Sequence, residues 1–442
     1  MLDAVSDAAW VQAMLDVEAA LARVESRLGI IPISAADAIV AHCQVAEFDI
    51  AELGRKAVDA ANPVVPLVSA LRARVPKDAA SFVHYGATSQ DILDTAMMLI
   101  ARRALDLILQ DLARAAATTA ALADRHRSTV MAARTLLQQA LVTTFGVKAA
   151  GWLASIIESR AMLASMHNHR LALQFGGAVG TLAALSDRGP EVARALAAEL
   201  GLWEPLMPWH TARARVVELG SALAIASGVA GKVALDVILL AQTEVGEVSL
   251  RSSGRGGSST LPQKQNPVNA VEILAAVRGV NAQVAGLLGT MLQEHERAAG
   301  AWQSEWPAVC NALRLTGGAA SRLADILEEI EVDTERMRQN LGLSGGLIMS
   351  EHIVMMLSER VDGVTARKLV DAAVSRTINS GRLFNEVLIE DPMITAQLPP
   401  PQLAKGLDPY SYLGASDQLI DRTLGAYREH SKQVRRRVKG ET

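Results

Sequence analysis

The chain has 442 residues, of which 50% are hydrophobic but only 3% aromatic, and it carries 43 basic and 47 acidic residues. That length is enough for two or three domains, and a net charge of -4 gives no electrostatic case for binding nucleic acid. With only Cys43 and Cys310 present, a disulfide framework is disfavoured and a reducing, cytoplasmic compartment is expected. The N-terminal MLDAVSDAAW shows neither a basic nor an apolar signal region, so we expect no signal peptide.

Alanine and leucine supply most of the apolar residues, which favours helices, and no run alternates as strands do. We therefore predict an all-α protein. Ser6 or Asp7 can cap a first helix, apolar residues then recur at helical spacing, and Gly29 ends it. Short helices broken by prolines follow, which predicts an N-terminal helical domain over residues 1–87.

Residues 88–342 predict a bundle of long helices. No Pro or Gly interrupts residues 89–125, and Thr88 and Asp91 have the spacing of a capping box at their start. The apolar run at 216–240 is interrupted by Ser and Lys, so we interpret it as a core helix and not a membrane span. Breaks at Gly and Pro then predict a C-terminal helical domain over 343–442. Four further long helices are expected. One runs through Trp152 to about 173, and the others cover about 216 to 248, 268 to 297 and 302 to 341.

A polar stretch, SSGRGGSSTLPQKQNPVN at residues 252–269, separates two of these helices. Its glycines allow sharp bends, and Pro267 fits the first turn of a helix, whose free N–H groups favour anions. A flexible linker is the alternative interpretation. A linker does not need the ordered tail formed by Ser258, Lys264 and Asn266, so we interpret the stretch as part of a site.

Two other polar stretches lie at expected helix boundaries: HYGATSQD at residues 84–91 and RTLLQQA at 134–140. With the 257–267 segment GSSTLPQKQNP, they resemble the HxGxTSxD, RTHxQxA and GSSxMPxKxNP motifs of the fumarase/aspartase superfamily. The resemblance spans nearly the whole chain. It implies three helical domains in a homotetramer with a central twenty-helix core, and active sites that each combine the three stretches from three subunits.

Within the superfamily, the chain resembles most the bacterial 3-carboxy-cis,cis-muconate cycloisomerase branch, through residues 84–95, 173–185, 208–210, 256–270, 293–297 and 302–306. That resemblance implies closure of a tricarboxylate diene to 4-carboxymuconolactone in the protocatechuate branch of the β-ketoadipate pathway. It implies a small-molecule substrate, no metal and no cofactor. Positioning and preorganised electrostatics would supply the rate.

The resemblance also assigns roles to residues. Ser258 would transfer the α-proton, while Lys264 and Asn266 would stabilise the aci-carboxylate. Arginines are candidate forks for substrate carboxylates. The candidate substrate-binding residues are His84, Thr88, Ser89, Arg134, Thr135, Gln138, His295 and Arg297, with His210, Arg213 and Arg215 as weaker candidates.

Two positions depart from the wider superfamily. Leu136 stands where elimination enzymes have a histidine acid, and Val271 stands where a carboxylate commonly follows the asparagine. Their joint absence disfavours chemistry that must protonate a leaving group, and we expect Leu136 to wall an apolar pocket. Two alternatives stay open: a C–N or C–O lyase that takes its acid from His84 or His295, and a non-catalytic helical tetramer, as some superfamily lens proteins are.

Overall fold

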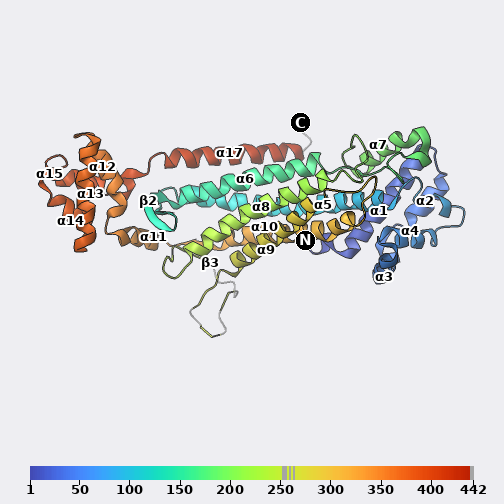
Figure 1. Ribbon diagram of the computed structural model, residues 1–442, viewed down its shortest axis with the longest axis horizontal. Helices are drawn as coiled ribbons and strands as arrows, with labels where there is room; N and C mark the ends of the chain where they lie inside the picture. The colour runs from blue at the N-terminus through green and yellow to red at the C-terminus, as the bar shows by residue number, and fades with distance from the viewer. Residues whose placement is uncertain (251–255, 258–259, 262–263, 439–442) are drawn as a thin grey trace. The chain divides into compact units, whose positions relative to one another are not determined.

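The computed structural model describes residues 1–438 except 251–255, 258–259 and 262–263. Over these residues the fold is mainly helical, as predicted, with 17 α-helices (Figure 1). The expectation that strands are absent is wrong. Within the described residues, four short strands form two antiparallel two-stranded sheets. One joins β1 (Val130–Thr135) to β2 (Gln138–Thr144), and the other joins β3 (Val248–Leu250) to β4 (Ile330–Val332).

The N-terminal region begins as predicted. The side chain of Ser6 accepts a hydrogen bond from the backbone N–H of Ala9 and caps α1, and Gly29 follows its end at φ 70°. Short helices then alternate with turns. The helices of this region are α1 (Asp7–Arg27), α2 (Ile33–Ala41), α3 (Ile50–Ala60) and α4 (Val64–Arg72).

Five long helices follow. The first, α5 (Ser89–Arg125), has the predicted bounds, because nothing in that stretch breaks a helix. The next four expected ends are too late: helices end at His169, Leu240, Gly289 and Glu329, not near 173, 248, 297 and 341. Two of these ends lead into β3 (Val248–Leu250) and β4 (Ile330–Val332), which pair with each other. The other long helices are α6 (Phe145–His169), α8 (Ala214–Leu240), α9 (Val268–Gly289) and α10 (Ala301–Glu329).

The stretch 134–140 lies in a hairpin formed by β1 (Val130–Thr135) and β2 (Gln138–Thr144). Thr135 pairs with Gln138, so Leu136 and Leu137 alone form the turn. Both have positive φ, 50° and 66°, as a type I′ turn requires. Glycine and asparagine usually fill such turns, so this leucine pair is strained, and it is also exposed, Leu136 to 97%.

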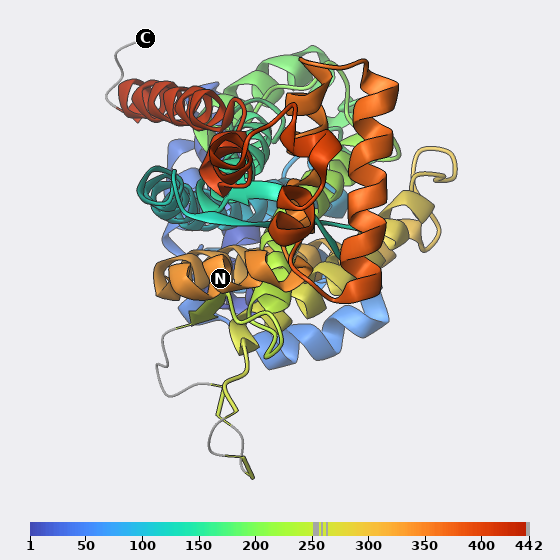
Figure 2. The same cartoon turned by 90° about the vertical axis from the view of Figure 1, so that its left-hand side faces the viewer.

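The C-terminal helices enclose a core of their own. Phe384, Leu388 and Ile394 are completely buried in it, and Figure 2 shows these helices in orange. The remaining helices are α7 (Gly189–Leu200), α11 (Thr334–Leu341), α12 (Ser350–Ser358), α13 (Gly363–Ser380), α14 (Phe384–Ile389), α15 (Pro392–Thr395), α16 (Pro400–Gly406) and α17 (Ser416–Val438).

The chain divides into two compact units, each built from three segments. Unit 1 comprises residues 1–113, 158–231 and 272–323, and unit 2 comprises 114–157, 232–271 and 324–442. The five long helices therefore each contribute to both units. The division into domains 1–87, 88–342 and 343–442 remains a prediction.

Small residues bring the long helices of unit 1 close together. A Cβ at Gly220 of α8 would lie 2.7 Å from a Leu287 methyl of α9, and one at Gly279 of α9 would lie 2.7 Å from a Leu315 methyl of α10. By length and composition alone, α8 and α9 could also cross a membrane, as could the bent pair 334–344 and 347–358. The apolar window of α9 is only 22% buried within the chain, so this helix leaves apolar surface exposed.

Candidate functional site

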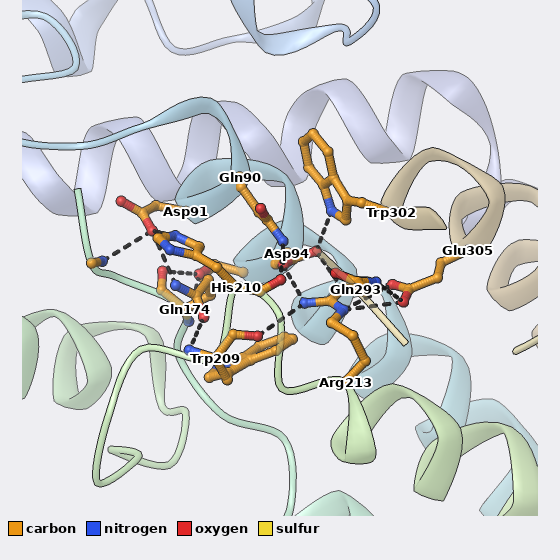
Figure 3. Close-up of polar contacts among 12 residues, drawn as sticks. Gln90, Asp91, Asp94, Gln174, Trp209, His210, Arg213, Gln293, Trp302 and Glu305 are labelled. Atoms are coloured by element: carbon orange, nitrogen blue, oxygen red, sulfur yellow. Dashed lines mark hydrogen bonds and ion pairs between the residues drawn. The ribbon is translucent and has the colours of Figure 1, made fainter. Parts of the chain in front are cut away.

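Asp91, which is fully buried in the first turn of α5, is the centre of a polar cluster in unit 1 (Figure 3). Its Oδ1 lies 2.7 Å from Nε2 of His210, and its Oδ2 accepts a hydrogen bond from the backbone N–H of Thr88. Its other donors are the side chain of Gln174 and the backbone N–H groups of Gly176 and Gly177. These hydrogen bonds compensate the carboxylate for the loss of water on burial.

One turn further along α5, Asp94 shares the buried Arg213 with Glu305 of α10. The Nη1 and Nη2 atoms of Arg213 lie 2.7 and 3.0 Å from the two Asp94 oxygens, and Nη2 lies 2.6 Å from Glu305. Trp302 donates its indole N–H to Asp94 at 2.9 Å. Burial raises the pKa of Glu305 despite its contact with Arg213. The cluster binds α5, α8 and α10 together in one unit.

Gln90 connects the two carboxylates to the loop before α10. Its amide donates to Asp94 and to the backbone oxygen of His210, and its own oxygen accepts from Arg297 at 3.0 Å. Arg297 also donates to the backbone oxygen of Ala178 at 2.7 Å. The structure thus joins the 84–91 stretch, the 174–178 loop, His210 and Arg297 in one network.

The other candidate substrate-binding residues of unit 1 are His84, Thr88, Ser89 and His295. His84 is half-buried at φ 64°, and its Nδ1 lies 2.6 Å from Oε1 of Glu18. Thr88 forms half of the expected capping box, through its backbone N–H. Ser89 begins α5 and is partly exposed. His295 is exposed, with φ 44°.

The second stretch lies in unit 2, and its arginine is already paired. Arg134 forms a fork on the buried carboxylate of Glu247, at 2.9 and 2.7 Å, and Asn340 donates to the same carboxylate. In this chain the fork therefore holds the β1–β2 hairpin to the segment just before β3. Thr135 and Gln138 flank the hairpin turn and are exposed.

Leu136 differs from expectation. It lines no apolar wall among the described residues and is almost fully exposed, because the two-residue turn directs it away from the hairpin's packed face. The buried face of the hairpin is formed instead by Val130, Ala132 and Val142, against residues from 341 to 349.

The third stretch, also in unit 2, is partly described. Ser258 lies outside the described residues, and Lys264 is exposed. Asn266 donates from both its backbone N–H and its side chain to the backbone oxygen of Gly256, at 3.0 and 2.9 Å. Gly256 has φ 82°, and a Cβ there would lie 2.3 Å from the backbone oxygen of Asn266, so only glycine fits. Asn266 therefore ties the start of α9 to Gly256.

Sequence reasoning treated Asp91 as a cap and missed the buried acids Asp94, Glu305 and Glu247, which pair with the candidate residues Arg213 and Arg134. The available signal was a set of acids inside otherwise apolar helices, since such groups are seldom buried without partners. Among the described residues no group of three or more His, Cys, Asp or Glu side chains is arranged to bind a metal.

Comparison with known proteins gives the class of this long-helix fold. A family model described as "Lyase" matches residues 2–286, and one described as "Adenylosuccinate lyase C-terminus" matches residues 346–423. The protein is thus a helical enzyme of the lyase type. The chain belongs to the fumarase/aspartase superfamily, as its three motifs indicate.

Similar proteins cover almost the full chain. A 3-carboxy-cis,cis-muconate cycloisomerase of Bradyrhizobium diazoefficiens is 46% identical over 428 residues, which is 96% of this chain and 95% of the relative. A nitrosuccinate lyase of Streptomyces davaonensis is 44% identical over 434 residues, 96% of this chain and 91% of the relative. The crystal structure of 3-carboxy-cis,cis-muconate lactonizing enzyme from Pseudomonas putida matches with a TM-score of 0.92 at 39% identity, covering 96% of each chain.

Proposed function

We propose that the protein is a cycloisomerase that interconverts 3-carboxy-cis,cis-muconate and 4-carboxymuconolactone. The observation that carries the proposal is Leu136: a chain so similar to lactonizing enzymes lacks the histidine acid of the elimination branch. In lactonisation, a carboxylate oxygen of the substrate bonds to one alkene carbon, and the neighbouring carbon takes up one proton. No leaving group requires a proton in this direction.

The proposed machinery uses all three stretches. Ser258 exchanges the proton on the carbon α to a carboxylate, while Lys264 and Asn266 stabilise the negative charge that develops on that carboxylate. The first stretch and Arg297 bind the remaining carboxylates, with the Asp91 and Asp94 clusters holding their backbone in place. The exposed hairpin tip, with Thr135 and Gln138, contributes from another chain.

A homotetramer with sites shared by three subunits is part of the proposal. The first stretch belongs to unit 1 and the other two to unit 2. The exposed apolar surface of α9, including Val271 and Leu288, and the exposed tip at Leu136 need cover that this chain alone does not supply. We expect this assembly in the cytoplasm.

The deciding assay follows ultraviolet absorbance after 3-carboxy-cis,cis-muconate is added. Loss of the diene chromophore, with lactone as the product, supports the proposal. Unchanged absorbance at high enzyme concentration contradicts it.

A second candidate is C–N elimination, favoured by the 44% identity to a nitrosuccinate lyase. The same preparation is therefore given nitrosuccinate, and fumarate is measured. Fumarate formation without diene turnover would make elimination the activity.

A further inference from the structure

Two acids of α1, Glu18 and Glu25, are buried beneath the first stretch. They lie two helical turns apart on one face, and their side chains are 1% and 0% exposed. Among the described residues, Oε2 of Glu18 and both carboxyl oxygens of Glu25 have no hydrogen-bond partner. Buried acids without donors are costly, so their presence calls for a reason beyond packing.

Glu18 makes one strong contact. Its Oε1 lies 2.6 Å from Nδ1 of His84, a length typical of a charge-assisted hydrogen bond. His84 has the left-handed backbone, φ 64°, that residues with a Cβ adopt rarely. Such a conformation persists only where surrounding contacts hold it, and the bond to Glu18 is one of these contacts. The Nε2 atom of His84 makes no hydrogen bond within the described residues.

The charges around His84 favour an imidazolium paired with one carboxylate. Burial acts to lower the pKa of His84, but attraction to Glu18 and the hydrogen bond with it prevail, so the pKa is raised. Asp91 adds to the rise and Arg72 opposes it. Burial, followed by repulsion from Glu18, raises the pKa of Glu25 to about 8, which favours its neutral form in the fold. Burial, again followed by Glu18, raises the pKa of Cys43 to about 12.

We propose that Glu18 is a positioning residue that binds Nδ1–H of His84 and so presents Nε2–H to a carboxylate of the bound substrate. Glu25 is a neutral neighbour in this arrangement. The proposal rests on the proposed function for the identity of the substrate, but the state of His84 can be measured without turnover.

The experiment compares Glu18→Gln with the matched control Glu25→Gln in the full chain. Deuterium exchange at Cε1 of individual histidines, read by mass spectrometry across pH, reports the pKa of His84. Glu18→Gln removes the negative charge, so we expect that pKa to fall by about one unit or more. Glu25→Gln replaces a group that is already neutral, so we expect the pKa of His84 to stay at the wild-type value.

Activity provides the second measurement. With 3-carboxy-cis,cis-muconate, Glu18→Gln should raise KM about tenfold, with a smaller effect on kcat. It should also move the descending limb of the kcat/KM profile, on which activity is lost as His84 deprotonates, to lower pH. Glu18→Asp, which keeps the charge, should restore part of both effects. Far-UV circular dichroism checks that each variant is folded, and Glu18→Asp serves as the test variant if Glu18→Gln does not fold.

An unchanged pKa of His84 in Glu18→Gln overturns the inference, as does an equal shift in both variants. Failure of the wild-type chain to consume the diene contradicts the proposed function instead. In that case the histidine pKa comparison still decides whether Glu18 positions His84.

Discussion

At the residue scale, the burial of Glu25 makes the unfolding free energy depend on pH. Its pKa in the fold is raised to about 8 from 4.5, so the folded chain keeps a proton that the unfolded chain releases. Stability from this group is therefore fully present below pH 4.5 and is lost as pH rises toward 8. At about 1.4 kcal/mol per unit of pKa, the loss amounts to a few kcal/mol. We predict that Glu25→Gln flattens this dependence and raises the unfolding free energy at pH 8.

Urea titrations at pH 5 and pH 8 measure the effect. Glu52→Gln on exposed α3 is the control, and it should leave the difference between the two pH values as in the wild type. A wild-type unfolding free energy that does not fall between pH 5 and 8 by more than the control explains would contradict the account of Glu25.

Ser258 carries the proposed proton transfer. Ser258→Ala should remove most turnover of the diene while far-UV helicity stays unchanged, because it removes one hydroxyl from a polar, glycine-rich stretch that lies between α8 and α9 in the sequence. Ser252→Ala, at the start of the same stretch, is the matched control and should stay active. Near wild-type turnover in Ser258→Ala would assign proton transfer to another residue, with His84 the next candidate.

At the element scale, the hairpin turn places two leucines at an exposed tip, and their backbone conformation lowers the stability of the fold. Leucines at two positive-φ positions each cost about 1 kcal/mol relative to residues that favour that conformation. Replacing Leu136 and Leu137 with Asn and Gly should therefore raise the Tm. If the tip contributes to a site in another chain, the same change should lower kcat/KM at least about tenfold.

Ala61→Gly provides the control for that prediction. Ala61 also has a positive φ, 55°, at the end of α3, so glycine there should raise stability without changing activity. Full activity of the Asn-Gly variant would mean that the tip takes no part in catalysis.

The buried arginine between α5 and α10 provides a second test at this scale. Arg213→Met leaves Asp94 and Glu305 buried without their shared cation, which should cost about 3–5 kcal/mol of unfolding free energy. Arg215→Met, two residues along α8 and partly exposed, should cost less than about 1 kcal/mol. Comparable losses in chemical denaturation would show that the buried cluster is not special.

At the scale of the whole molecule, we predict a homotetramer, measurable by light scattering with static mass detection. Active sites built from different chains also predict that two inactive variants can complement each other. Ser258→Ala and His84→Ala variants, each with little activity, should recover activity when unfolded and refolded together. Random assembly gives roughly a quarter of the sites both native residues. A fully active monomer, or refolded mixtures without recovery, would contradict the shared site.

The sequence alone determined the features that depend on near neighbours along the chain. The cap at Ser6, the stop at Gly29 and the bounds of α5 were predictable because caps, prolines, glycines and helical spacing act within a few residues. The three motifs and their family were readable for the same reason. Only the tertiary structure decided the rest.

The hairpin at 130–144 forms because its apolar residues pack against residues near 341–349, about two hundred positions away. The ends of α8 and α10 depend on the pairing of β3 with β4. Arg213 and its partner Asp94 are 119 residues apart, and Glu18 and His84 are 66 apart. Burial strengthens the ion pairs and hydrogen bonds that these acids form. Burial is a property of the packed chain, and no local sequence pattern contains it.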